Sequence, residues 1–299
     1  MSDHHHHHAS SELTHNIKQA FFLNALFTVI ELIGGILTNS TAILADAVHD
    51  FGDCIALGQA WYFQGLSENA GTARYTYGFN RFSLLSALIN IVLLLLSSAY
   101  VLSEAIPRLI TPESTNAQGM VLLAILGVTA NGLAVLRLSK SQNVSARVVS
   151  LHLLEDVLGW LAVLLVAVVL LFKDIPILDP ILAVLITLYI ASGAVKNLKK
   201  TVNLLLQATP EDADVSQLIA EIESLDFIQH AHHVHVWSLD GEHHVLTAHL
   251  VTKRPLNNEE YADSKKNISE LIERHGYFHS TIELEWPDEV CRIEHSHCH

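Results

Sequence analysis

Two histidine–aspartate pairs with identical spacing are the side chains of this sequence best suited to bind a metal ion. His49 stands four residues before Asp53, and His152 stands four residues before Asp156. In a helix, this spacing places both side chains of a pair on one face, one turn apart. Two such helices facing each other would supply two nitrogen and two oxygen ligands, a set that suits tetrahedral Zn²⁺. The pattern therefore predicts a four-ligand site for a divalent metal.

Both pairs lie inside long apolar segments, which makes their presence costly. An ionisable side chain in the middle of a bilayer costs at least about 2.5 kcal/mol unless it is paired, hydrated or bound to an ion. The alternative interpretation is a buried polar network that holds helices together, which is common for a single such residue. Two matched pairs on separate segments favour metal binding instead. Asp46 shares the face of His49 and is expected to line the pathway or to accept a hydrogen bond from a ligand.

The elements that must position these side chains are expected to be membrane-spanning helices. Of the 299 residues, 50 % are hydrophobic and 16 % are charged, which is too apolar for an ordinary soluble protein of this size. Six apolar segments are each near or above the roughly 20 residues needed to cross a bilayer. The sequence therefore predicts a six-helix transmembrane domain over residues 13–206, with spans at about 17–38, 41–66, 82–106, 117–138, 144–172 and 175–196.

Basic residues indicate how these helices are oriented. They gather in alternate connections and after the last helix, at Arg74, Arg81, Arg137, Lys140, Arg147, Lys196, Lys199 and Lys200. Connections rich in lysine and arginine stay in the cytoplasm, so both termini are expected there. We expect the protein to reside in a bacterial inner membrane. The formal charge of −14 leaves no basic face for nucleic acid, which is therefore not an expected partner.

Polar and alternating patterns predict a second domain over residues 207–290. Helix, strand, strand, helix and strand follow in that order, and Asp240-Gly241 predicts a hairpin turn between the first two strands. This αββαβ order is typical of a small α+β domain with helices on one face of an antiparallel sheet. Alternation along the strands makes a site of two histidines and a glutamate geometrically possible. A solvated, histidine-rich sheet face is the alternative.

The two ends of the chain are rich in possible metal ligands but lack a structural pattern. Residues 1–12 are expected to be disordered, and the run His4 to His8 is either an expression tag or a native metal-gathering segment. Residues 291–299 form a tail of histidines and cysteines, and its end, Glu294 to His299, would bind zinc transiently while it remains disordered.

Five motifs distributed from about Leu13 to Glu289 are specific when taken together. They are Ile43-Leu44-Ala45-Asp46-Ala47-Val48-His49-x-x-x-Asp53, Arg74-Tyr75-Thr76-Tyr77-Gly78-x-x-Arg81, His152-x-x-x-Asp156, Leu178-Asp179-Pro180 and His235-Val236-Trp237-Ser238-Leu239. With these motifs the chain resembles the cation diffusion facilitators, and specifically their zinc-transporting branch. It departs from some members of that family, because the loop after the fourth helix has no histidine cluster.

This resemblance implies a homodimeric, proton-coupled antiporter that exports Zn²⁺ from the cytoplasm by alternating access. Cd²⁺ and Co²⁺ are further possible substrates, and the lipid bilayer is the surrounding medium. The transport site would consist of His49, Asp53, His152 and Asp156. The C-terminal domain would be cytoplasmic and similar to a metallochaperone or ferredoxin-like domain. Its zinc ligands would be His235, His249 and Glu285.

Two other functions are weighed against this one. The segment His152-Leu153-Leu154-Glu155 superficially starts an inverted zincin motif, which would suggest an intramembrane zinc metallohydrolase. Its fifth residue is Asp156 rather than histidine, and four protein ligands would close the open position that a catalytic zinc needs. A membrane zinc sensor that uses mainly the C-terminal domain would leave the membrane ligands unexplained. A transporter, not an enzyme, is therefore expected.

Overall fold

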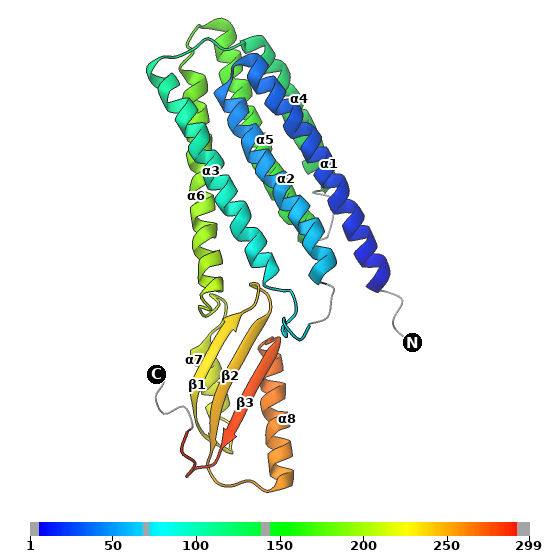
Figure 1. Ribbon diagram of the computed structural model, residues 1–299, viewed down its shortest axis with the longest axis vertical. Helices are drawn as coiled ribbons and strands as arrows, with labels where there is room; N and C mark the ends of the chain where they lie inside the picture. Colours follow the sequence, from blue (N-terminus) through cyan, green and yellow to red (C-terminus); the bar gives the residue numbers. More distant parts are fainter. Residues whose placement is uncertain (1–5, 68–71, 139–143, 292–299) are drawn as a thin grey trace. The chain divides into compact units, whose positions relative to one another are not determined.

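The computed structural model describes residues 6–67, 72–138 and 144–291, so residues 1–5 and the tail beyond residue 291 lie outside the described residues. The chain divides into two compact units. One consists of residues 1–70 and 85–198 and is built from long helices, and the other consists of residues 71–84 and 199–299 and contains a sheet (Figure 1).

Among the described residues, six long helices lie wholly or largely in the first unit. They are α1 (His6–Thr38), α2 (Thr41–Ser67), α3 (Phe82–Ile110), α4 (Ala117–Leu138), α5 (Val144–Phe172) and α6 (Leu178–Leu205). α1 begins inside the segment that was expected to be disordered. Among the described residues, five helices are long and apolar enough to cross a membrane, namely α1, α3, α4, α5 and α6. A helical membrane domain is thereby confirmed. α2 is not among the five because its aspartates and His49 lower its hydropathy, and the count of six spans stays a prediction.

Small residues allow the helices of this unit to approach closely. A Cβ atom on Gly127 of α4 would lie 2.2 Å from the Trp160 ring of α5, so only glycine fits there. Trp160 is 1 % exposed, and its ring also packs edge-on against Phe27 of α1, with ring centroids 6.0 Å apart. Likewise, a Cβ atom on Gly34 of α1 would lie 2.5 Å from Leu123 of α4. Close packing at glycine is a common way to join helices in membranes.

The outer surface of these helices is apolar. Large hydrophobic side chains are exposed along them, among them Phe22, Leu26, Leu122, Leu165 and Leu185. Such a surface would be an aggregation hazard in water, but lipid chains solvate it. The burial pattern therefore agrees with a bundle that is surrounded by a bilayer.

In the part of the second unit that the structure describes, a three-stranded sheet and two helices follow the αββαβ order that the sequence predicts. Its elements are α7 (Val215–Glu223), β1 (Ile228–Ser238), β2 (His244–Thr252), α8 (Asn258–Arg274) and β3 (His279–Glu285). β1 pairs antiparallel with β2, but β3 pairs parallel with β2. The expectation of an antiparallel sheet is wrong for β3, because α8 carries the chain back across the sheet before β3 begins.

One hydrophobic core joins the sheet to both helices, and it includes Leu218 and Ile222 of α7, Leu246 and Leu250 of β2, and Ile268 and Ile272 of α8. Both helices therefore cover one face of the sheet, and the other face is free for polar side chains. α8 starts with a capping box, in which Asn257 accepts from the backbone of Glu260 and Glu260 accepts from the backbone of Asn257. The segment 71–84 belongs to this unit, since the Tyr77 ring packs edge-on against His279 at 5.5 Å.

Candidate metal sites

His49 and Asp53 lie one turn apart on the same face of α2. The His49 Nε2 atom is 3.7 Å from the Asp53 Oδ2 atom, and the two side chains are 19 % and 26 % exposed. Both side chains are therefore largely surrounded by the bundle, but each keeps an accessible edge. A metal ion could replace the direct contact by taking one nitrogen and one oxygen from this pair.

The second pair lies on α5, on the part of this helix that approaches α2. Asp156 is half-buried and interacts electrostatically with Asp46 of α2. Gly159 lies one turn beyond Asp156, and a Cβ atom placed on it would be 4.0 Å from the Asp46 carboxylate. His152 is part of α5, but its side chain lies outside the described residues. The structure thus brings Asp156 to the side of α2, and the four-ligand set stays a prediction.

Further carboxylates surround the α2 pair. Glu31 of α1 is 1 % exposed, and Asp46 and Asp50 of α2 are each 7 % exposed. These three side chains interact electrostatically with one another and with Asp156. Carboxylates that are close together and shielded from water repel one another strongly. A cation or bound protons would relieve this repulsion, so the cluster favours positive charge at this position.

A small cavity adjoins His49. It is lined by residues from three helices, namely Ala45, Val48 and His49 of α2, Leu94, Ser97, Ser98 and Val101 of α3, and Thr187 and Ile190 of α6. The walls are mostly apolar, and the hydroxyl groups of serine and threonine provide the few polar contacts. His49 therefore lies between the carboxylate cluster and a space that α3 and α6 border.

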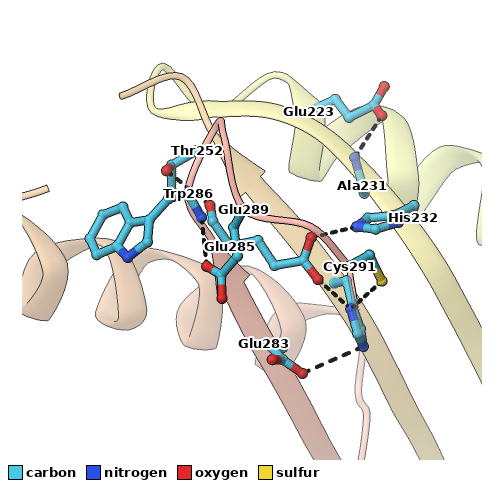
Figure 2. A network of polar contacts seen from close by, with 10 residues as sticks. Glu223, Ala231, His232, Thr252, Glu283, Glu285, Trp286, Glu289 and Cys291 are labelled. Carbon is cyan, nitrogen blue, oxygen red and sulfur yellow. Dashed lines mark hydrogen bonds and ion pairs between the residues drawn. The ribbon is translucent and has the colours of Figure 1, made fainter. Parts of the chain in front are cut away.

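A second group of possible ligands lies on the sheet of the C-terminal unit (Figure 2). Glu285, the last residue of β3, is 3 % exposed and contacts two histidines. Its Oε1 atom is 2.6 Å from Nδ1 of His249, and its Oε2 atom is 2.9 Å from Nε2 of His232. Cys291 approaches the same place, with its Sγ atom 3.7 Å from Nδ1 of His249. The carboxylate thus holds both imidazole rings in position.

The composition of this group fits a metal ion. One ligand atom from each of His232, His249, Glu285 and Cys291 lies within 4.8 Å of all the others. Two imidazoles, a carboxylate and a thiol are ligands that Zn²⁺ accepts in tetrahedral sites. Bond lengths of about 2.0–2.3 Å in a tetrahedral zinc site put the ligand atoms roughly 3.3–3.7 Å apart. The hydrogen-bonded pairs would therefore have to separate and the more distant atoms approach, which side-chain rotation allows. We refer to these four residues as the sheet site.

The electrostatics of the sheet site keep its carboxylate ionised. Burial raises the pKa of Glu285, but the hydrogen bonds and charges of His232 and His249 outweigh burial and lower its pKa overall. The neighbouring His233 has a lowered pKa because of partial desolvation and the nearby His232 and His249. An ionised carboxylate is the form that binds a metal ion.

The sheet site contains two of the three residues expected from the sequence. His249 and Glu285 lie together, but His235 is exposed and pairs with Thr247, whereas His232 pairs with His249. The cause is a β-bulge between His232 and His235, where His233 has a positive φ of 49°. A bulge adds one residue to a strand and redirects its side chains. Simple alternation therefore could not identify His232.

Cys291 was not among the expected ligands, because the sequence pattern places it in the tail that follows the second domain. It follows β3 by only a few residues, and the chain turns back so that its thiol reaches His249. The signal that could have identified it is its distance along the chain from Glu285, which is short enough for a turn. Such a signal is weak without knowledge of the strand ends.

The fold and these side chains define a class of protein, a multi-pass helical membrane protein with histidine and carboxylate side chains between its helices. The family described as "Cation efflux transmembrane domain" matches residues 17–206. The chain belongs to this cation efflux family, which confirms the resemblance to the cation diffusion facilitators and their zinc-transporting branch.

Bacterial relatives with related names match nearly the whole chain. It is 32 % identical over 270 residues to the "Cadmium, cobalt and zinc/H(+)-K(+) antiporter" of Bacillus subtilis, covering 89 % of this chain and 87 % of the relative. It is 32 % identical over 294 residues to the "Zinc transporter ZitB" of Escherichia coli, covering 94 % and 92 %. It is 30 % identical over 273 residues to the "Metal cation efflux system protein CzcD" of Cupriavidus metallidurans, covering 90 % and 86 %.

Proposed function

We propose that this protein exports Zn²⁺ from the cytoplasm in exchange for protons, with His49, Asp53, His152 and Asp156 as the transport site. The observation that supports this most strongly is the partly buried His49–Asp53 pair, which lies among carboxylates that include Asp156 of the neighbouring helix. The names of the relatives from Escherichia coli and Bacillus subtilis, a zinc transporter and a cation/proton antiporter, agree with this function. Cd²⁺ and Co²⁺ are proposed as further substrates.

The exchange follows from the chemistry of the ligands. A histidine and an aspartate bind a metal ion only in their deprotonated forms, so a metal ion and protons compete for the same atoms. Zinc that arrives from the cytoplasm displaces protons, and protons that arrive from the other side displace zinc. Helix movements that expose the site to one side at a time would complete the cycle. The small cavity beside His49 lies where α2 borders α3 and α6. Nucleotides and covalent intermediates are not needed for this cycle.

The arrangement in the membrane is part of the proposal. Six helices span the inner membrane, and α2 is the polar span that carries the site. Both termini and the C-terminal domain lie in the cytoplasm, as the distribution of arginine and lysine indicates. Two copies of the chain form a homodimer.

The sheet site is proposed to sense zinc in the cytoplasm. His232, His249, Glu285 and Cys291 would hold one zinc ion and join three parts of the C-terminal domain, namely β1, the β2–β3 pair and the segment after β3. Metal bound there would stabilise one packing of this domain, because binding to the folded form alone adds to its stability. The domain would thereby couple the zinc load of the cytoplasm to the packing of the dimer.

Zinc flux into proteoliposomes with an imposed pH gradient tests the transport function. The wild-type protein is expected to move zinc only when the gradient is present, whereas His49→Ala is expected to lose this flux. Thr129→Val is a matched control, because Thr129 is exposed on α4 and its hydroxyl binds only carbonyl groups of its own helix. Zinc binding without flux in the wild-type protein would instead indicate a membrane sensor, and zinc-dependent hydrolysis would indicate an enzyme.

A further inference from the structure

A carboxylate of α6 binds the beginning of α2. Asp179 lies in the first turn of α6 and is completely buried. Its Oδ1 atom accepts from the Ser40 hydroxyl at 2.5 Å and from the Ala42 backbone N–H at 3.4 Å. Its Oδ2 atom accepts from both the backbone N–H and the hydroxyl of Thr41, each at 2.7 Å. One side chain of α6 thus receives four hydrogen bonds from Ser40 and the first two residues of α2.

These contacts give hydrogen-bond partners to backbone N–H groups at the start of α2, and the partner lies on another helix. The first N–H groups of a helix have no partners within it, and their partial positive charge attracts an anion. The Ser40 hydroxyl accepts from the Ile43 backbone N–H at 3.2 Å, as an N-cap residue does, and Asp179 takes the N–H groups of Thr41 and Ala42. Hydrogen bonds to an ionised carboxylate are among the strong ones in proteins. The contact therefore joins α6 to the start of α2 through several hydrogen bonds.

The turn between α1 and α2 is held from other sides as well. Asn39 has a positive φ of 53°, and its carbonyl accepts from Arg108 of α3 at 3.1 Å. The Thr38 carbonyl accepts from the Asn116 backbone N–H, next to α4, at 2.8 Å. The cavity begins farther along α2, at Ala45, and farther along α6, at Thr187. The bundle is therefore tightly joined at this end, and space lies beyond it.

We propose that Asp179 is a positioning residue of the transport cycle, which holds the first turn of α6 against the beginning of α2 while the cavity beside His49 changes shape. This inference rests on the proposed transport function. Asp179 does not touch the transported ion, but it acts through α2, which carries His49 and Asp53. Separating the two helices would leave a buried carboxylate and several buried donors without partners, which is costly. The contact is therefore kept as the helices move.

The test compares zinc binding and zinc flux for Asp179→Asn, with the full chain in proteoliposomes. The side chain of asparagine has one oxygen and one NH₂ group, so it cannot accept hydrogen bonds on both sides. We expect the maximal zinc flux to fall at least ~10-fold, while the zinc affinity of the membrane site stays within ~3-fold of wild type. Asp179→Glu, which keeps the charge, should recover part of the flux.

Thr41→Val provides a second measurement that leaves the carboxylate in place and is mild for folding. It should lower the maximal flux in the same manner but less, and combining it with Asp179→Asn should lower the flux little further, because both changes affect one contact. The control Thr129→Val should leave the flux unchanged.

Wild-type flux in both Asp179→Asn and Thr41→Val would overturn the proposal. An equal loss of flux and zinc affinity in Asp179→Asn would also overturn it, because that result would indicate a structural role only. Failure of the wild-type protein itself to exchange zinc for protons would refute the proposed function instead, so the two failures are distinguishable.

Discussion

The membrane pair on α2 and the sheet site in the C-terminal domain combine similar ligands in different surroundings. In the membrane, histidine and aspartate lie one helical turn apart, among further carboxylates and beside a cavity. In the sheet site, a 3 % exposed glutamate is hydrogen-bonded to two histidines, and a thiol lies beside them. Under the proposed function, the first arrangement suits an ion that is transported, and the second suits an ion whose binding reports the zinc level of the cytoplasm. Similar residue types would thus serve transport or sensing according to access and ligand softness.

The largest expected effect is a loss of zinc flux when a proposed ligand in the membrane is removed and the sheet site is left intact. Asp156→Ala should lower proton-driven zinc flux on the order of 100-fold, because it removes one of the four proposed ligands of the transport site. Zinc binding at the sheet site should remain, which calorimetry on the purified protein would show as one retained site. Unchanged counterflow of protons in this variant would contradict the assignment of Asp156.

A smaller effect is expected from the thiol of the sheet site. Cys291→Ser should weaken Cd²⁺ binding at this site by about 10-fold and Zn²⁺ binding by less, because cadmium is softer and prefers thiolate. Flux through the membrane site should change less than in Asp156→Ala. Absorption spectroscopy of the Co²⁺-loaded protein would report the thiolate directly, since its charge-transfer band should disappear in this variant.

The matched control for this prediction is His235→Ala, which removes the exposed histidine that the sequence pattern favoured. We expect it to leave the cadmium affinity unchanged, because His235 pairs with Thr247 and lies outside the group of ligands. A loss of affinity in His235→Ala that matches the loss in Cys291→Ser would support the ligand set expected from the sequence.

The smallest expected effect concerns the stability of the C-terminal domain, at a residue of α8 that belongs to neither candidate metal site. Hydrogen bonds from Arg254 and from the Asn257 backbone lower the pKa of Glu260 from 4.5 to about 2. A lowered folded-state pKa stabilises the domain above the unfolded value, and this contribution is lost as the pH falls from about 4.5 toward 2. Glu260→Gln should therefore reduce the acid sensitivity of α8, measured by hydrogen exchange between these pH values. Glu259→Gln, which leaves the Arg254 contact intact, should behave like wild type, and equal acid sensitivity in Glu260→Gln would contradict the assignment.

The contrast between the two sites also explains which parts could be predicted from the sequence. His49 and Asp53 are four residues apart, and helical periodicity alone places them together. His232 could not be identified in the same way, because its position depends on a bulge that the sequence does not reveal. Helix geometry is local, whereas strand register depends on a distant partner.

The fold shows the same division. The helical membrane domain and the αββαβ order follow from hydropathy and turn residues, but the parallel pairing of β3 depends on how α8 crosses the sheet. The contact of Asp179 with Thr41 joins residues that are far apart in the chain, and the Asp179-Pro180 motif gave no indication of that partner.

The polarity of α2 has a consequence for how the protein enters the membrane. A segment with Asp46, Asp50 and Asp53 is a poor candidate for independent insertion, because each aspartate near the centre of a span is unfavourable by about 2.5–3.5 kcal/mol. α1 is apolar, packs along α2, and is joined to it by a turn at Asn39. We therefore expect α1 and α2 to leave the insertion machinery together as a helical hairpin. The apolar α1 would thereby promote the membrane insertion of α2, the helix that carries His49 and Asp53.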